Sequence, residues 1–145
     1  MPMDPVEVTA RLTNDKVQFA GVARDNATIT CDYYPPFGDG QGYTGLELLL
    51  VSLAACSGTA VVGLLRKMRK EVAGFSIHAR GIRREQHPTA FTHITLDFTL
   101  TSPDAREADL QQAITLAEAS YCPVWAMLKG NVEINTVTHV TVPVG

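Results

Sequence analysis

Residues 48–65, with the sequence LLLVSLAACSGTAVVGLL, decide the fold of this chain. The run contains no charged residue and is followed directly by Arg66 and Lys67. Its length is at the lower end of what a membrane-spanning helix needs, but a helix that is apolar on all sides is equally typical of the centre of a soluble domain. Its serine, threonine and glycine residues weaken its hydrophobicity, and strand-like segments flank it on both sides. We therefore predict a buried central helix and no membrane association.

The helix around this run is predicted to extend from Gly45 to Lys70. Thr44 is in the N-cap position, and Glu47 three residues later completes a capping box, in which each side chain accepts a hydrogen bond from the backbone N–H of the other residue. Basic residues at the far end are favoured by the helix macrodipole.

With a formal net charge of −3, the chain lacks the dense basic surface that phosphate binding needs, so no nucleic-acid partner is expected.

The residues before the helix predict a three-stranded meander. Residues 6–12, 17–23 and 27–33 are rich in valine, threonine, isoleucine and aromatic side chains, which favour strands. Turn segments rich in asparagine and aspartate separate them. Residues 34–43 (YPPFGDGQGY) are crowded with proline and glycine and are expected to form a loop.

The hydrophobic period changes from helical to two after Gly74. Apolar and polar side chains alternate in residues 75–80 and again in residues 93–100, on either side of a loop at residues 85–88. Alternation places one set of side chains on one face of a strand, so these two segments predict a β-hairpin with one buried face.

The C-terminal part predicts two helices and a last strand. The second helix is expected to start at Ser102-Pro103, because proline is favoured at the first helical position. A short helical segment is expected between Cys122 and Gly130, before a closing strand at residues 132–142. The core-facing residues of the second helix, at spacings of four, three and four, are expected to be Leu110, Ile114, Ala117 and Tyr121.

The composition bounds the class of protein. At 145 residues, with 46% hydrophobic and 19% charged residues, the chain fits a single α+β domain over residues 1–145. Three cysteines, an odd number, suit a reducing compartment better than a secreted disulfide framework. The first residues carry no signal pattern, so a cytoplasmic protein is expected. The four histidines have no metal-ligand spacing, and neither a metal nor a bound cofactor is predicted.

Cys56 and Cys122 are the candidate catalytic thiols. Cys122 precedes Pro123, which favours the start of a helical turn, and amides at a helix N-terminus stabilise a thiolate. Position alone therefore favours Cys122 over Cys56, which lies in an apolar run. Each of the two is also explained as a small, inert core residue, since cysteine is so often buried. Cys31, in a strand-like segment, is interpreted as structural.

Glu47 has two interpretations. The capping box explains this residue without any catalytic role. Glu47 also lies nine residues before Cys56, which is half a turn out of phase on a straight helix, so the two side chains do not point together. For Glu47 to serve Cys56, the helix start must bend or the glutamate must come from a second chain.

Several segments resemble motifs of the OsmC/Ohr family. Residues 44–56, TGLELLLVSLAAC, are similar to a family motif in which a Pro-x-Glu-Leu-Leu segment leads to Ala-Ala-Cys. The resemblance covers nearly the whole chain, and each cysteine of the pair lies in its own matching motif. Later landmarks of the family's YhfA-like branch are matched by Arg83-Arg84-Glu85, Phe91-Thr92-His93-Ile94 and Tyr121-Cys122-Pro123-Val124.

This resemblance implies a two-cysteine peroxidase for organic hydroperoxides. Cys56 would be the peroxidatic thiolate that becomes a sulfenic acid, and Cys122 the resolving thiol that closes an intramolecular disulfide. An external dithiol reductant, a dihydrolipoyl group in some members, would restore both thiols. Glu47 matches the family's active-site carboxylate.

The resemblance also implies an OsmC-like fold in which two chains intertwine, with the active site at their interface. The residues agree with a homodimer, because the long helix is too apolar for one side of a small domain to cover. Its small residues would let another backbone approach closely: Ala54, Ala55, Gly58 and Gly63.

Two positions depart from the family pattern. Gly45 stands where the family usually has proline. The hydroperoxide-reducing branch holds its thiolate and carboxylate with an arginine from the N-terminal strands, whereas residues 12–17 (LTNDKV) contain none, and Arg11 and Arg24 are the nearest. This difference favours an alternative in which the same fold is a non-enzymatic homodimer that binds a small apolar ligand or senses redox state.

Overall fold

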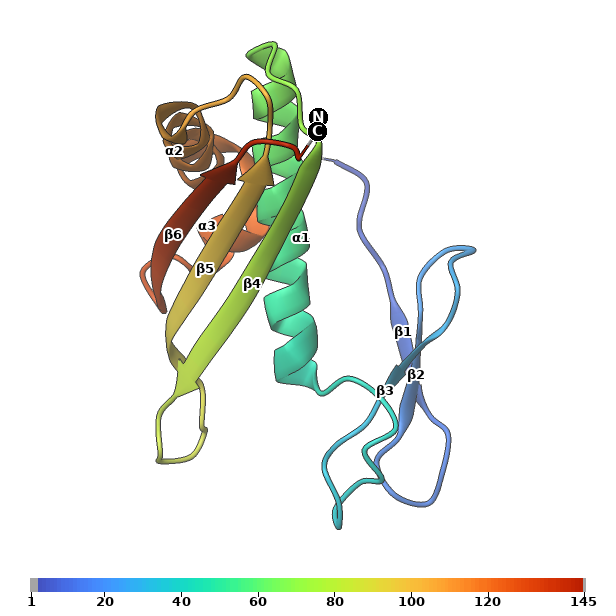
Figure 1. Ribbon diagram of the computed structural model, residues 1–145. Coiled ribbons are helices and arrows are strands. Elements are labelled where there is room, and N and C mark those ends of the chain that lie inside the picture. The colour runs from blue at the N-terminus through green and yellow to red at the C-terminus, as the bar shows by residue number, and fades with distance from the viewer. Residues whose placement is uncertain (1–2, 145) are drawn as a thin grey trace. The chain divides into compact units, whose positions relative to one another are not determined.

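The computed structural model describes residues 3–144, which fall into an N-terminal unit up to Leu49 and a C-terminal unit from Leu50 onward. In the N-terminal unit, three short strands form the antiparallel meander that the sequence predicts (Figure 1). The single domain over residues 1–145 stays a prediction. The strands of this sheet are β1 (Thr9–Leu12), β2 (Phe19–Val22) and β3 (Ile29–Cys31).

The loop after β3 is fastened by the buried side chain of Asp32. Its carboxylate accepts hydrogen bonds from the backbone N–H groups of Tyr33 (2.8 Å), Gln41 (3.1 Å) and Asp39 (3.3 Å). Burial acts to raise the pKa of Asp32, but these three donors outweigh burial and lower the pKa below its ordinary value. The proline- and glycine-rich segment is therefore an ordered loop.

Helix α1 (Gly45–Lys67) begins with the predicted capping box. The Thr44 N–H donates to Glu47 Oε1 at 2.8 Å, and the Glu47 N–H donates to Thr44 Oγ1 at 3.1 Å. The helix ends three residues before the predicted Lys70. Arg69 adopts a left-handed backbone (φ 63°), which stops the helix as a terminal αL residue does.

Within one chain, α1 buries one stripe rather than its whole circumference. In the single chain, 28% of the most apolar 18-residue window of α1 is buried, and the predicted cover of the remainder by a second copy stays a prediction. Among the described residues, α1 is also the one helix that is long and apolar enough to cross a membrane, by length and composition alone. The buried residues follow each other at spacings of four: Leu53, Ser57, Val61 and Leu65.

The C-terminal unit contains a second three-stranded sheet in the order β4-β5-β6. Strands β4 (Gly74–Arg83) and β5 (Phe91–Thr101) form the predicted antiparallel hairpin, and β6 (Glu133–Thr141) pairs parallel to β5. In this unit the helices lie on one face of the sheet (Figure 1). The central strand fills the core beneath them with every second side chain: Ile94, Leu96, Phe98 and Leu100.

The second helix starts later than the sequence predicts. Helix α2 spans Glu107–Leu116, so the prediction that it begins at Ser102-Pro103 is wrong. The Ser102 hydroxyl instead accepts the backbone N–H of Ala105 at 2.9 Å and forms a local turn. The N-cap residue is Arg106, whose N–H donates to the Asp109 carboxylate at 2.8 Å.

A π-helical turn, η1 (Ala117–Tyr121), joins α2 to the short helix α3 (Pro123–Leu128). The Cys122 N–H donates to the carbonyl of Ala117, five residues earlier, at 2.8 Å. The wider turn rotates the chain out of the 3.6-residue period. Leu110, Ile114 and Ala117 are buried as predicted, but Tyr121 is 57% exposed, and its predicted place in the core is wrong.

Candidate thiol site

Cys122 is a buried thiol at the N-cap of α3. Its Sγ accepts the backbone N–H of Trp125 at 3.4 Å, while the indole of Trp125 packs in the core. The predicted N-cap position is therefore confirmed. Because Pro123 occupies the first helical position and has no N–H to satisfy, the local sequence favours the start of a helix immediately after Cys122.

Cys56 lies on α1 with its sulfur next to this turn. Burial raises the pKa of the Cys56 thiol, the backbone N–H of Val124 acts on the same sulfur as a hydrogen-bond donor that lowers the pKa, and the neighbouring Cys122 thiol raises it again. Two consecutive backbone N–H groups of α3 thus act as donors to the two sulfurs, that of Val124 to Cys56 and that of Trp125 to Cys122. The structure brings together the two cysteines that are 66 positions apart in the sequence.

Ser57 is a third member of this cluster, and the sequence analysis missed it. Its Oγ donates to the Leu53 carbonyl at 2.6 Å and lies 3.6 Å from Cys122 Sγ. Ser57 is completely buried. The available signal was its spacing of four from both Leu53 and Val61, which places it on the core stripe of α1.

A cavity of about 460 Å³ opens beside Cys56. Its volume is in the range of small-molecule sites, roughly 300–1,000 Å³. The cavity follows one side of α1, with residues at helical spacing, and residues next to the start of α3 line its other side. Its lining residues are Cys56, Thr59, Ala60, Gly63, Leu64 and Lys67 on α1, with Tyr121 and Pro123 opposite.

Glu47 and Cys31 are described by their local contacts. Both capping hydrogen bonds of Glu47 are made with Thr44, so its structural role is confirmed, and its catalytic role stays a prediction. Cys31 pairs with Phe19 across the N-terminal sheet and is a free thiol. Among residues 3–144, no group of three or more histidine, cysteine, aspartate or glutamate side chains is arranged to hold a metal ion.

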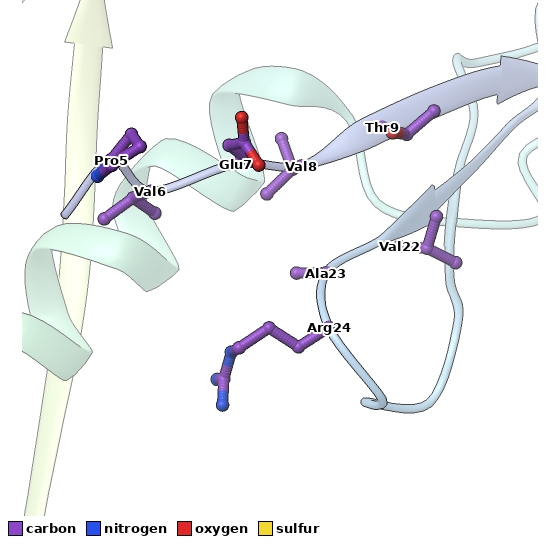
Figure 2. A pocket seen from close by; sticks show the side chains of 8 residues that line it. All are labelled: Pro5, Val6, Glu7, Val8, Thr9, Val22, Ala23 and Arg24. Carbon is purple, nitrogen blue, oxygen red and sulfur yellow. The ribbon is translucent and has the colours of Figure 1, made fainter.

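The arginines nearest to the position expected for the family lie in the N-terminal unit. Arg11 is on the exposed strand β1, and Arg24 is in the turn after β2, with a left-handed backbone (φ 52°). Arg24 lines a hollow of about 600 Å³ between residues 5–9 and 22–24, where its side chain extends away from the strand (Figure 2). Within the described chain, no cation contributes to the pKa shift of Cys56.

Comparisons with known proteins match the chain over most of its length. The sequence model described as OsmC-like protein matches residues 38–137. Protein YhfA of Escherichia coli (strain K12) is 36% identical over 89 residues, which are 61% of this chain and 66% of that protein, so the match spans just under two thirds of the relative. A hypothetical protein from Aquifex aeolicus VF5 has a crystal structure with a TM-score of 0.85 at 31% identity, covering 98% of this chain and 100% of that one. An organic hydroperoxide resistance protein OsmC from Legionella pneumophila shares the fold, with a TM-score of 0.72 at 12% identity over 97% and 100% of the two chains.

Proposed function

Because this chain belongs to the OsmC-like protein family and is YhfA-like within it, we propose that it is a thiol-dependent peroxidase that reduces organic hydroperoxides. The observation that carries the proposal is the adjacent pair of sulfurs, Cys56 and Cys122, each with a backbone N–H donor from α3. A structural neighbour that is named an organic hydroperoxide resistance protein supports the same chemistry.

The proposed reaction begins with the Cys56 thiolate, which attacks one oxygen of the hydroperoxide. A sulfur–oxygen bond forms, the oxygen–oxygen bond breaks, and the alkoxide takes a proton and leaves as the alcohol. Cys122 then attacks the sulfenic sulfur of Cys56, and the hydroxyl group departs as water with the proton that Cys122 gives up. A dithiol reductant, for which we propose a dihydrolipoyl group, reduces the disulfide by thiol–disulfide exchange.

The cavity beside Cys56 supports an organic rather than a purely inorganic peroxide. Ala60, Gly63 and Leu64 of α1 line part of it, and they would contact the alkyl part of a hydroperoxide whose reactive oxygen lies at the sulfur. Because apolar lining provides little hydrogen bonding, it favours an alkyl group over water in the same space.

A second copy of the chain is the proposed partner of the exposed side of α1. Within one chain, 28% of the most apolar window of α1 is buried, and a contiguous exposed apolar surface marks an interaction site. We propose the reducing cytoplasm as the place of action. Sedimentation at micromolar concentration is expected to give a dimer, and a stable monomer would contradict this part of the proposal.

A second candidate function is a non-enzymatic ligand-binding or redox-sensing protein. The observation that favours it is that burial raises the pKa of Cys56 without any opposing cation among the described residues. A thiol with a raised pKa has less of the reactive thiolate near neutral pH. In this case the cavity would bind its ligand without turnover.

Turnover of cumene hydroperoxide with dihydrolipoamide separates the two functions. The parent protein is expected to consume both reagents, and Cys56→Ser and Cys122→Ser are each expected to stop steady turnover. Cys31→Ser is the matched control and is expected to keep the parent rate, because Cys31 lies in the other sheet. If the parent protein shows no turnover, the proposed peroxidase function is refuted and the binding function is supported.

A further inference from the structure

The buried hydroxyl of Ser57 touches the Cys122 sulfur, and the reaction steps above do not use this contact. The Ser57 Oγ lies 3.6 Å from Cys122 Sγ, and the two residues are 0% and 2% exposed. We infer that Ser57 is a positioning residue that switches its hydrogen bond with Cys122: it accepts the S–H in the reduced protein and donates to the sulfur when Cys122 attacks Cys56. The resolving role of Cys122 rests on the proposed function; the contact itself does not.

The hydrogen count gives the direction of this contact in the reduced protein. Ser57 has one hydroxyl hydrogen, and it is donated to the Leu53 carbonyl at 2.6 Å. The Trp125 backbone N–H is donated to Cys122 Sγ. The remaining hydrogen available for the Ser57–Cys122 contact is the S–H of Cys122, and the serine oxygen has a lone pair to accept it. The contact thus runs from the Cys122 S–H to the serine oxygen.

During disulfide closure, the sulfur of Cys122 loses its proton and gains negative charge. A rotation about the Cβ–Oγ bond of Ser57 turns its hydrogen from the Leu53 carbonyl to this sulfur without moving a heavy atom. The carbonyl of Leu53 keeps its backbone bond within α1. A hydrogen bond to a charged acceptor is stronger than one between neutral groups, so the rotated donor stabilises the attacking sulfur.

Other titratable and charged groups near Cys122 do not offer the same help. Cys56 from α1 is the reaction partner. From η1, the Tyr121 side chain is exposed, and Glu118 forms a 2.9 Å surface ion pair with Lys129, which follows α3. The core-facing side chains of β5 are apolar: Ile94, Leu96, Phe98 and Leu100. Within the described residues, the Ser57 hydroxyl is thus the side-chain donor in contact with this sulfur.

A disulfide probe tests the switch without any peroxide. In a Cys31→Ser background, 5,5′-dithiobis(2-nitrobenzoate) forms a mixed disulfide with Cys56 and releases one thionitrobenzoate. Cys122 then attacks the Cys56 sulfur, the protein disulfide forms, and the second thionitrobenzoate leaves as a thiolate. The rate of this second release, measured against pH, reports the attack by Cys122.

Ser57→Ala is expected to slow the second release by about 3- to 10-fold at neutral pH and to move its pH midpoint up by about 0.5 to 1 unit, the size of one lost hydrogen bond. Ser57→Thr keeps the hydroxyl and is expected to restore the midpoint. Thr115→Ala, which removes a hydroxyl from an exposed position of α2, is the control and is expected to keep the parent midpoint.

If Ser57→Ala has the same pH midpoint as the parent protein, the inference is overturned even if the rate falls. A packing defect alone would slow the reaction equally at every pH. A midpoint in Ser57→Thr that matches that of Ser57→Ala would overturn it too. If the extra methyl of threonine prevents folding, the comparison of Ser57→Ala with Thr115→Ala decides alone. If the parent protein does not turn over hydroperoxide but Ser57→Ala still shifts the pH midpoint, the proposed peroxidase function is refuted. The inferred role of Ser57 is then still supported.

Discussion

Cys122 has two roles in this structure, and two substitutions separate them. Its sulfur is half of the proposed redox pair, and it is also the acceptor at the start of α3, 3.4 Å from the Trp125 nitrogen. Cys122→Ser removes the thiol but keeps an acceptor of a type that is preferred at N-caps. Cys122→Ala removes both. The two variants should therefore lose the same chemistry and differ in stability.

The size of the difference follows from the burial of the cap. Loss of an N-cap acceptor costs about 1 kcal/mol, and a buried N–H without a partner costs about 1–3 kcal/mol. Both values describe the loss of the same hydrogen bond and are not added. The free energy of unfolding is therefore expected to fall by about 1–3 kcal/mol in Cys122→Ala and by less than about 1 kcal/mol in Cys122→Ser. With a urea m-value of about 1–3 kcal/mol/M, the alanine variant should unfold at a urea concentration lower by about 1 M.

Both variants are expected to stop at the sulfenic acid of Cys56. Limiting cumene hydroperoxide in the presence of dimedone should label Cys56 in each variant, as measured by mass spectrometry of peptides. A serine variant as unstable as the alanine variant would refute the capping role. Dimedone on Cys122 in the Cys56→Ser protein, with none on Cys56 in the Cys122→Ser protein, would reverse the assignment of the two thiols.

Three further predictions concern the sheet, the loop and the thiol. In Gly81→Ala the new Cβ would overlap the Phe91 ring, so urea unfolding should show a loss of about 1–3 kcal/mol. Gly74→Ala, whose new Cβ would make ordinary contacts of 3.5 Å with Thr101 in the same sheet, should lose less. Asp32→Asn should destabilise the protein at neutral pH. Because the pKa of Asp32 is lower in the folded than in the unfolded protein, its contribution is present above the unfolded pKa and lost as pH falls through the folded pKa, so urea unfolding of parent and variant should converge in acid. Iodoacetamide labelling of Cys56 should have a pH midpoint above that of free cysteine, about 8.5, because burial raises its pKa. A lower midpoint would contradict this direction.

Local sequence signals predicted the elements whose cause is local. The Thr44–Glu47 capping box depends on residues three apart, and both of its hydrogen bonds are present. The alternation in the hairpin depends on a period of two, and the alternating residues of β5 are buried. The cap of α3 could be predicted because Pro123 restricts its own backbone and that of Cys122.

The signals failed where a neighbouring group changes a local preference. Ser102 has the chemistry of a helix start, but its hydroxyl closes a separate turn, and α2 begins only at Glu107. The extra residue in the π-turn has no sequence signature, and it moves Tyr121 out of the core and to the edge of the cavity. The helical period alone could not predict either feature.

The thiol cluster could be predicted only in part. The resemblance pairs Cys56 with Cys122, but the neighbouring amides of Val124 and Trp125 that serve them become visible only when α3 packs against α1. Ser57 was missed for the same reason. A serine among the buried residues of a helix indicates no function until its contact with the Cys122 sulfur is known.

The central claim is that a hydroperoxide drives Cys56 and Cys122 into one disulfide. The most direct measurement is peptide mass spectrometry of the reduced parent protein after one equivalent of cumene hydroperoxide, with Cys31→Ser as the matched control. The account predicts that both proteins lose two hydrogens and yield one cross-linked peptide pair that contains Cys56 and Cys122. Unchanged free thiols at both positions, or a cross-link that includes Cys31, would contradict it.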